Sequence, residues 1–242
     1  MSGLIRSLTL GLALIAKFAG LVRSGRSAGN EPGHTIRIDD YAHVDRTTLM
    51  EAKRTAAGIF RKASVESRWT EFSPATSRIT GNAVDPDIFV LSDIQLRILP
   101  GSMAERLGLR DGVLGVAPGA ETGRRLAYVF YNRVASLTQE LMWKRARGDV
   151  CESASTAQIL GHAMAHEIGH LLLNLESHSD SGILRANWDV RTLENACYGY
   201  LLFTRQQAEL MRAEVHRRLI ELASGRDEKV AAPEDRVMIA RQ

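Results

Sequence analysis

The chain of 242 residues lacks several features that would assign it directly to a protein class. It contains only two cysteines, Cys151 and Cys197, so it can form one disulfide at most, and two buried thiols are the alternative. Although the net charge is +3, lysines and arginines are interspersed with acids and form no long basic stripe, which leaves nucleic-acid binding without support. There are no internal repeats. The remaining composition, 45% hydrophobic, 24% charged and 6% aromatic, is that of a water-soluble chain with one folded domain.

Long apolar runs are also missing, except at the N-terminus. Arg6 is followed by the apolar run 8–16, then by Lys17 and a second short apolar stretch that ends at Val22. This pattern resembles a secretory signal, and an uncleaved anchor or an amphipathic helix is the alternative. We therefore predict that residues 1–22 are a signal peptide or N-terminal anchor. The protein would then be secreted or held at the cell envelope, and it would meet a membrane only through this segment.

The rest of the chain divides into three parts. Residues 23–34 are rich in Gly, Ser and charge and are typical of a linker, 35–224 form the folded domain, and 225–242 are typical of a flexible tail. The predicted elements are a strand at 36–38, a helix over 48–63, strands at 65–72, 87–92, 113–117 and 126–134, and helices over 136–147, 155–174 and from Thr204 onward. Three capping boxes mark helix starts: Thr48 with Glu51, Ser155 with Gln158, and Thr204 with Gln207.

The segment 155–174 carries the only organised set of reactive side chains that the sequence reveals. Its helix ends at Asn174, a residue that tolerates positive φ, and it contains the pattern HExxH at His166, Glu167 and His170. Side chains four residues apart project from one helical face, so the two imidazoles can hold one metal ion. The motif arises by chance in roughly one chain in a hundred of this length, but its apolar surroundings make the polar members costly unless they are paired or ligated. Histidines that meet solvent or bond locally are the alternative.

Zinc suits this arrangement because it takes neutral imidazole nitrogens and, in catalytic sites, keeps one position open for water. A bound zinc ion lowers the pKa of that water to about 7, and Glu167 can accept its proton as hydroxide attacks a peptide carbonyl. The same carboxyl group can return the proton to the leaving amine. Such a reaction needs no serine or cysteine nucleophile.

The third ligand must come from the residues after the helix. His178 follows His170 across the predicted turn and is the candidate favoured by ligand preference; Glu176 is its rival and Asp180 a weaker one. His162 lies one turn before the motif, and we interpret it as a buried, hydrogen-bonded histidine that supports the site.

At this point the sequence resembles the zincin metallopeptidases, and more closely their metzincin branch, whose pattern is HExxHxxGxxH followed by a methionine turn. It is similar in particular to uncharacterised bacterial proteins with the pattern HExGHLLLGxxxHSxxGIM, through residues 166–174, 178–179 and 182–184. Two positions depart from the family. Asn174 replaces the glycine of the turn, which Asn can do at modest cost, and Leu184 replaces the methionine that packs beneath the metal.

The resemblance implies an α+β, zincin-like fold: a mixed twisted sheet, an N-terminal helix, a zinc-binding active-site helix and a C-terminal helix. It also implies an edge strand that pairs with extended substrate, for which 113–117 is the candidate and a plain strand the alternative. A tyrosine that helps hold the oxyanion is found in some related enzymes; Tyr198 and Tyr200 lie in the right region, although packing is the more ordinary role for them.

The function that follows is a zinc-dependent metallopeptidase, exported from a bacterial cell and acting on a peptide or protein substrate. His166, His170 and His178 would hold the zinc ion and Glu167 would be the catalytic base. The alternative is a catalytically inactive zincin-like protein whose structural metal serves a binding or envelope role, and a hydrolase of non-peptide substrates is a third reading.

Overall fold

The structure is a computed structural model that describes residues 33–71, 94–145, 155–175 and 177–230. Several predictions concern residues outside these ranges: the signal or anchor segment 1–22, the strand at 87–92, the Cys151 half of the possible disulfide, and Glu176. No helix among the described residues is long and apolar enough to span a membrane.

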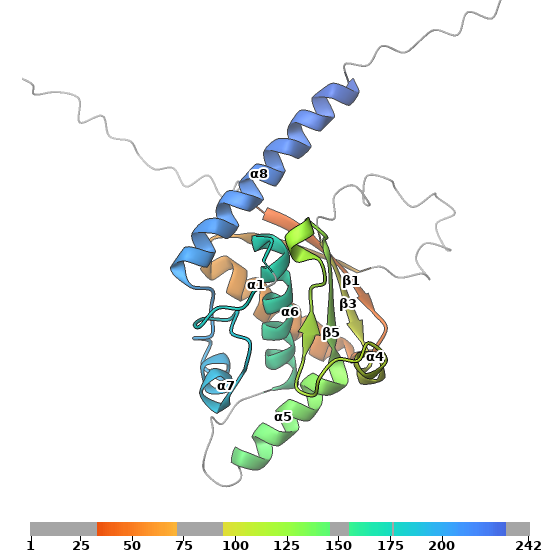
Figure 1. The fold of residues 1–242 in the computed structure, drawn as a ribbon, viewed down its shortest axis with the longest axis vertical. Coiled ribbons are helices and arrows are strands. Elements are labelled where there is room, and N and C mark those ends of the chain that lie inside the picture. Colours follow the sequence, from red (N-terminus) through yellow and green to blue (C-terminus); the bar gives the residue numbers. More distant parts are fainter. Residues whose placement is uncertain (1–32, 72–93, 146–154, 176, 231–242) are drawn as a thin grey trace, which may run out of the picture. The chain divides into compact units, whose positions relative to one another are not determined.

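A five-stranded mixed sheet forms one layer of the fold (Figure 1). Its strands are β1 (Gly33–Asp40), β2 (Glu66–Glu71), β3 (Ile94–Leu99), β4 (Gly115–Val116) and β5 (Leu126–Phe130). They lie in the order β2-β1-β3-β5-β4, with every neighbouring pair parallel except β4, which is antiparallel to β5. The predicted mixed sheet with an α+β composition is therefore confirmed, and β4 is one of its two edges.

The central strand β3 is absent from the strands predicted above. Its signal is nevertheless present in the sequence, because Ile94, Leu96 and Ile98 are buried while Gln95 and Arg97 between them are partly exposed. This alternation is the two-residue period of a strand with one face on the core. Because β3 pairs with both β1 and β5, it is the strand that joins the two halves of the sheet.

Six α-helices are described: α1 (Arg46–Lys62), α4 (Gly101–Arg106), α5 (Tyr131–Arg145), α6 (Thr156–Leu173), α7 (Val190–Cys197) and α8 (Arg205–Val230), with a 3₁₀ turn η1 at Ala120–Thr122. Neither α4 nor α7 was predicted. The predicted start of α1 is wrong, because the cap is Asp45, whose carboxylate accepts hydrogen bonds from the amides of Thr47 and Thr48.

Two further boundaries differ from the prediction. The strand expected over 126–134 ends at Phe130, and α5 begins at the next residue, Tyr131, rather than at 136. Aromatic and β-branched residues suit a strand, but here they fill the first turn of a helix that packs on the core. At the C-terminal end, α8 continues to Val230, past the point at which the tail was expected to begin.

Helix α6 is the buried element around which the fold is built, and it packs against both α1 and the sheet (Figure 1). Nearly all of its positions are buried, including every polar residue of the HExxH motif. It approaches α1 closely because Gly161 has no side chain: a Cβ there would lie 2.6 Å from both the Ala52 carbonyl oxygen and the Thr55 Cβ. The helix that carries the motif is therefore held by close packing against α1.

His34 is a correction to the predicted linker. It lies in β1 with a side chain that is only 2% exposed, and its ring meets Phe60 edge-on at a centroid distance of 5.1 Å. Neither ring nitrogen has a hydrogen-bond partner among the described residues. Burial, aided by the nearby positive charge of Arg218, lowers the pKa of His34 from 6.5 to about 3.

This burial predicts a loss of stability in acid. Below pH 6.5 the unfolded chain protonates His34 while the folded chain does not until about pH 3, so the free energy of unfolding falls across that window. The change His34→Leu should remove the part of the acid-dependent loss that His34 causes, about 2 kcal/mol between pH 7 and pH 5. Urea unfolding of wild type and variant at the two pH values measures it. His216→Leu, at an exposed histidine, is the control and should keep the wild-type pH dependence; an unchanged dependence in the His34 variant would contradict the prediction.

Candidate metal centre

Both ends of α6 are fixed as the sequence predicted. The Ser155 hydroxyl accepts a hydrogen bond from the Gln158 amide at 3.1 Å, and Asn174 ends the helix with φ 51° and ψ 43°, in the left-handed region. One half of the capping box differs. The Gln158 side chain donates to the carbonyl oxygens of Ala196 and Cys197, at 3.0 and 2.8 Å, instead of returning to Ser155. The N-terminal turn of α6 is thereby joined to the end of α7.

The imidazoles of His166 and His170 are each held by a backbone carbonyl. His166 Nδ1 lies 2.7 Å from the Ile183 oxygen, and His170 Nδ1 lies 2.7 Å from the Leu175 oxygen. A carbonyl oxygen can only accept, so in the neutral ring each Nδ1 carries the proton and each Nε2 offers a lone pair. Both histidines are thus set in the tautomer that ligates a metal through Nε2.

The two Nε2 atoms face each other at 3.1 Å. With both protons on Nδ1, no hydrogen lies between them, and two lone pairs at this distance repel one another. A cation shared by both nitrogens removes the repulsion, and two ligands of one tetrahedral zinc ion stand roughly 3.3 Å apart for bonds of about 2.0 Å. The chemistry of the donor pair therefore fits a metal ion.

His178 joins the pair from the loop after α6. Its ring centroid is 5.3 Å from that of His166 and 4.9 Å from that of His170, and the candidate ligand atoms of the three residues lie within 4.8 Å of one another. Among the described residues this is the group that could hold a metal ion. Asp180, the weaker alternative, is exposed and does not belong to the cluster. The predicted meeting of three imidazoles is what the fold produces.

Glu167 lies beside the histidine cluster. Its side chain is almost fully buried, and its Oε1 is 3.9 Å from His166 Nε2. Burial raises the pKa of Glu167 to about 8, and a divalent cation in the cluster would act in the opposite direction by favouring the carboxylate. The protonation state of Glu167 should therefore depend on whether a metal ion is bound to the cluster.

The edge strand β4 covers Glu167, and this contact requires glycine. A Cβ at Gly115 would lie 2.6 Å from Glu167 Cγ and 2.7 Å from both its Oε1 and the Tyr128 carbonyl oxygen. No real side chain tolerates such distances, so any larger residue must displace the carboxyl group or the strand. The main chain of β4 consequently lies directly against the candidate catalytic residue.

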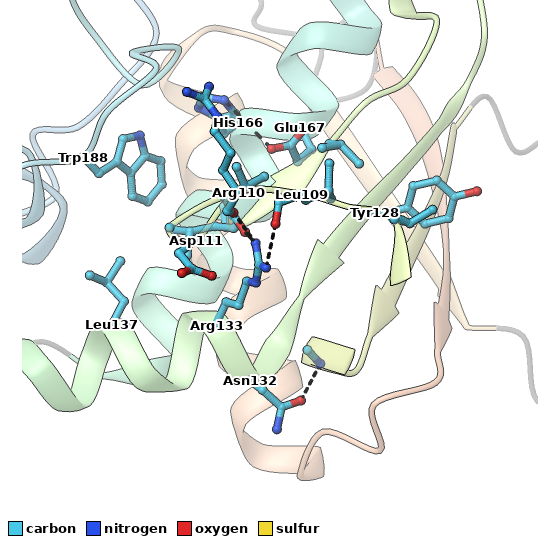
Figure 2. Close-up of a pocket in the computed structure, with 18 of the residues that line it drawn as sticks. Leu109, Arg110, Asp111, Tyr128, Asn132, Arg133, Leu137, His166, Glu167 and Trp188 are labelled. Carbon is cyan, nitrogen blue, oxygen red and sulfur yellow. Dashed lines mark hydrogen bonds and ion pairs between the residues drawn. The ribbon is translucent and has the colours of Figure 1, made fainter. Parts of the chain in front are cut away.

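An open cavity of about 1600 Å³ lies in front of the cluster, bounded by β4, α5, α6 and the segment before α7 (Figure 2). His166, Glu167, His170 and His178 all line it. Trp188 forms one wall, with its ring 5.8 Å from that of His166. The site is thus open to a ligand far larger than water.

Arg133 of α5 fixes the loop that leads into β4. Its guanidinium donates hydrogen bonds to the carbonyl oxygens of Leu109, Arg110 and Val113, at 3.2, 2.7 and 3.1 Å, and two of these bonds are visible in Figure 2. The sequence offered no signal for this residue, because its three acceptors are backbone atoms of a loop distant in the chain. It fixes one part of the cavity wall.

The remaining predicted residues have separate roles. His162 is buried, and its Nδ1 lies 2.8 Å from the Gln158 carbonyl oxygen, as expected of a locally bonded histidine. Tyr198 and Tyr200 are 60% and 72% exposed and do not line the cavity, so neither the oxyanion role nor the packing role fits them. Leu184 is fully buried in the core, which agrees with the packing role of the methionine that it replaces.

Comparison with known proteins adds one finding. No protein-family model and no curated protein sequence matches the chain. Among solved structures, the chain is similar to the crystal structure of archaemetzincin from Methanopyrus kandleri, with 12% identity and a TM-score of 0.42, over 78% of this chain and 99% of that one.

Trp188 provides an optical test of metal binding at the cluster. Cobalt(II), which has a partly filled d shell, should quench its emission because the ring lies beside His166. Titration of the metal-free protein with cobalt should lower the fluorescence of the wild type. The variant Trp69→Phe should be quenched as well, because Trp69 lies on β2, at the opposite edge of the sheet from β4. Trp188→Phe should lose most of the quenching. Equal quenching in the two variants would place the bound ion elsewhere.

Gly115→Ala tests the contact between β4 and Glu167. The added methyl should lower the free energy of unfolding by about 1–3 kcal/mol through overpacking. Part of that loss should disappear when Glu167 is also changed to Ala, because one of the colliding groups is then gone. Gly58→Ala, where the nearest atom to a new Cβ is 3.9 Å away, is the control. A cost of Gly115→Ala that is the same with and without Glu167 would show that the two residues are not in contact.

Proposed function

We propose that the protein is a zinc-dependent peptidase whose metal is held by His166, His170 and His178 and whose general base is Glu167. The observation that carries the proposal is that the Nε2 atoms of His166 and His170 face each other at 3.1 Å, with each Nδ1 against a backbone carbonyl and with a third imidazole and a buried carboxyl group beside them. All four side chains line one open cavity.

Zinc is the metal that these donors favour. Neutral imidazole nitrogens suit a borderline-soft ion, and three protein ligands leave one position of a tetrahedral shell open, as in catalytic rather than structural zinc sites. Zinc bound there would act as a Lewis acid and lower the pKa of a water molecule to about 7. A fourth protein ligand, Glu176 or Asp180, would mark the inactive alternative; Asp180 does not belong to the cluster, and Glu176 lies outside the described residues.

Glu167 supplies the proton transfers. Its carboxylate accepts a proton from the attacking water and returns it to the nitrogen of the leaving amine, which is general base and then general acid catalysis by one group. Its burial beneath β4 leaves the side chain little exposed to solvent although it lines the cavity. The residue is therefore positioned by packing, in contrast to His166 and His170, which are positioned by hydrogen bonds to backbone carbonyls.

The substrate that suits the cavity is an extended peptide. As an edge strand, β4 pairs on one side with β5 and leaves its other side unpaired within the sheet, and Gly115 and Val116 line the cavity. A peptide that adds to this edge would be bound through its main chain, with little dependence on its sequence. Such binding would bring a peptide bond past Glu167, because the β4 backbone touches that side chain.

We also propose that the protein acts outside the cytoplasm, in the bacterial envelope or medium. The support is the N-terminal sequence alone, in which Arg6 precedes an apolar run and a Gly- and Ser-rich stretch follows. The peptidase would then encounter peptide or protein substrates at the cell surface.

The change Glu167→Gln tests the mechanism. It preserves size and hydrogen bonding but cannot accept a proton, so peptide hydrolysis should fall by about 10²–10⁴-fold while zinc remains bound. Elemental analysis after dialysis reports the zinc content, and release of fluorophore from a mixed library of quenched peptides reports hydrolysis.

Glu105→Gln is the matched control, because this carboxylate lines the same cavity away from the histidines. It should hydrolyse the library as fast as wild type. Full activity of the Glu167 variant would refute its role as base. Stoichiometric zinc in a wild-type protein that cleaves no peptide would favour the inactive alternative.

A further inference from the structure

The N-terminal turn of α8 is tied to the loop that carries His178. Gln207 is a buried residue of this turn, 8% exposed, and its side-chain oxygen accepts a hydrogen bond from the Thr204 amide at 2.9 Å. The Thr204 hydroxyl in turn accepts from the Gln207 amide at 3.2 Å, which completes the predicted capping box. The side-chain nitrogen of Gln207 takes no part in the capping box. It donates a hydrogen bond to the Ser179 hydroxyl in the loop, at 3.0 Å.

Ser179 is the residue directly after His178, and it is held from several directions. Its amide donates to the Leu184 carbonyl oxygen at 2.9 Å, and its hydroxyl donates to the Ser181 carbonyl oxygen at 2.7 Å. The bond from Gln207 completes this set. The main chain that bears His178 is thereby fixed to the first turn of a long helix.

The need for such a tether follows from how differently the three histidines are held. The rings of His166 and His170 lie on a buried helix, and each donates its Nδ1 proton to a carbonyl oxygen. The ring of His178 is exposed, and among the described residues no carbonyl or carboxylate holds it. Its distance from the other two imidazoles therefore depends on where its own backbone is placed.

We propose that Gln207 is a positioning residue for metal binding, which acts through Ser179 to hold His178 within reach of the other two imidazoles. This inference rests on the proposed metal site. Glutamine suits the position because its oxygen caps the helix while its nitrogen bonds to the loop; a side chain with only acceptors could cap but could not donate to Ser179.

The experiment compares zinc affinities of the full chain, measured by competition with a chromophoric chelator. Gln207→Met, which keeps the length of the side chain but removes the donor, should bind zinc about tenfold more weakly, the size of effect usual for groups that orient ligands. Gln206→Met, at the exposed neighbouring glutamine, should bind as wild type does. Ser179→Ala removes the same bond from the loop side and provides the test if the Gln207 variant does not fold.

Two further variants separate positioning from helix capping and from the metal site itself. Thr204→Val removes one bond of the capping box but leaves the bond from Gln207 to Ser179, so its zinc affinity should stay within about twofold of wild type. His178→Ala should weaken zinc binding, and Gln207→Met should then cause no additional loss, because the residue through which it acts is gone. The absorption spectrum of the cobalt-substituted protein should change in Gln207→Met towards that of His178→Ala.

The outcomes distinguish failure of the inference from failure of the proposed function. If His178→Ala binds zinc like wild type, the three-histidine site is wrong. If His178→Ala weakens binding while Gln207→Met and Ser179→Ala do not, the site stands and the positioning role is overturned. An equal loss in Thr204→Val, or a full additional loss when Gln207→Met is combined with His178→Ala, would also overturn it by showing that Gln207 acts only on helix stability.

Discussion

Two hydrogen bonds from imidazole Nδ1 groups to backbone carbonyls decide the chemistry available at the centre of this protein. The carbonyls of Ile183 and Leu175 accept hydrogen bonds from the Nδ1 groups of His166 and His170, and the Nε2 atoms of the two rings are directed at each other. Without those acceptors either ring could turn or protonate on Nε2, and the site would have no reason to attract a cation. The proposed roles of the Glu167 carboxyl group and the open cavity depend on this orientation of the two Nε2 atoms, because both roles require a bound metal ion.

The rest of the fold keeps this arrangement in place by close packing around α6. Gly161 lets α1 approach on one side, and Gly115 lets the edge strand β4 rest on Glu167 on another. On the C-terminal side, the buried Arg218 of α8 donates a hydrogen bond to the Leu171 carbonyl oxygen at 2.9 Å, near the end of α6, while Gln207 of the same helix bonds to the loop after it. The helix can carry three buried histidines because the Nδ1 of each is hydrogen-bonded to a backbone carbonyl.

Local signals in the sequence predicted those elements whose ends are set by nearby residues. The limits of α6 at Ser155 and Asn174 and the capping box of Thr204 with Gln207 are confirmed, since capping depends on atoms a few residues apart. Where two local signals competed, the prediction was wrong: Asp45 outranks Thr48 as the cap of α1. The strand β3 was not predicted at all, although its apolar and polar residues alternate as they do in a strand with one buried face.

The sequence by itself determined that two imidazoles and a carboxylate lie on one helix, because residues four apart share a helical face whatever surrounds them. Tertiary structure alone decided their protonation states, the meeting with His178 and the cover provided by β4, since each depends on atoms distant along the chain. The carbonyl of Ile183 is the clearest example. Every residue has a backbone carbonyl, so no sequence pattern reveals which one will bond to a given side chain. Only the folded chain places the carbonyl of Ile183 against His166.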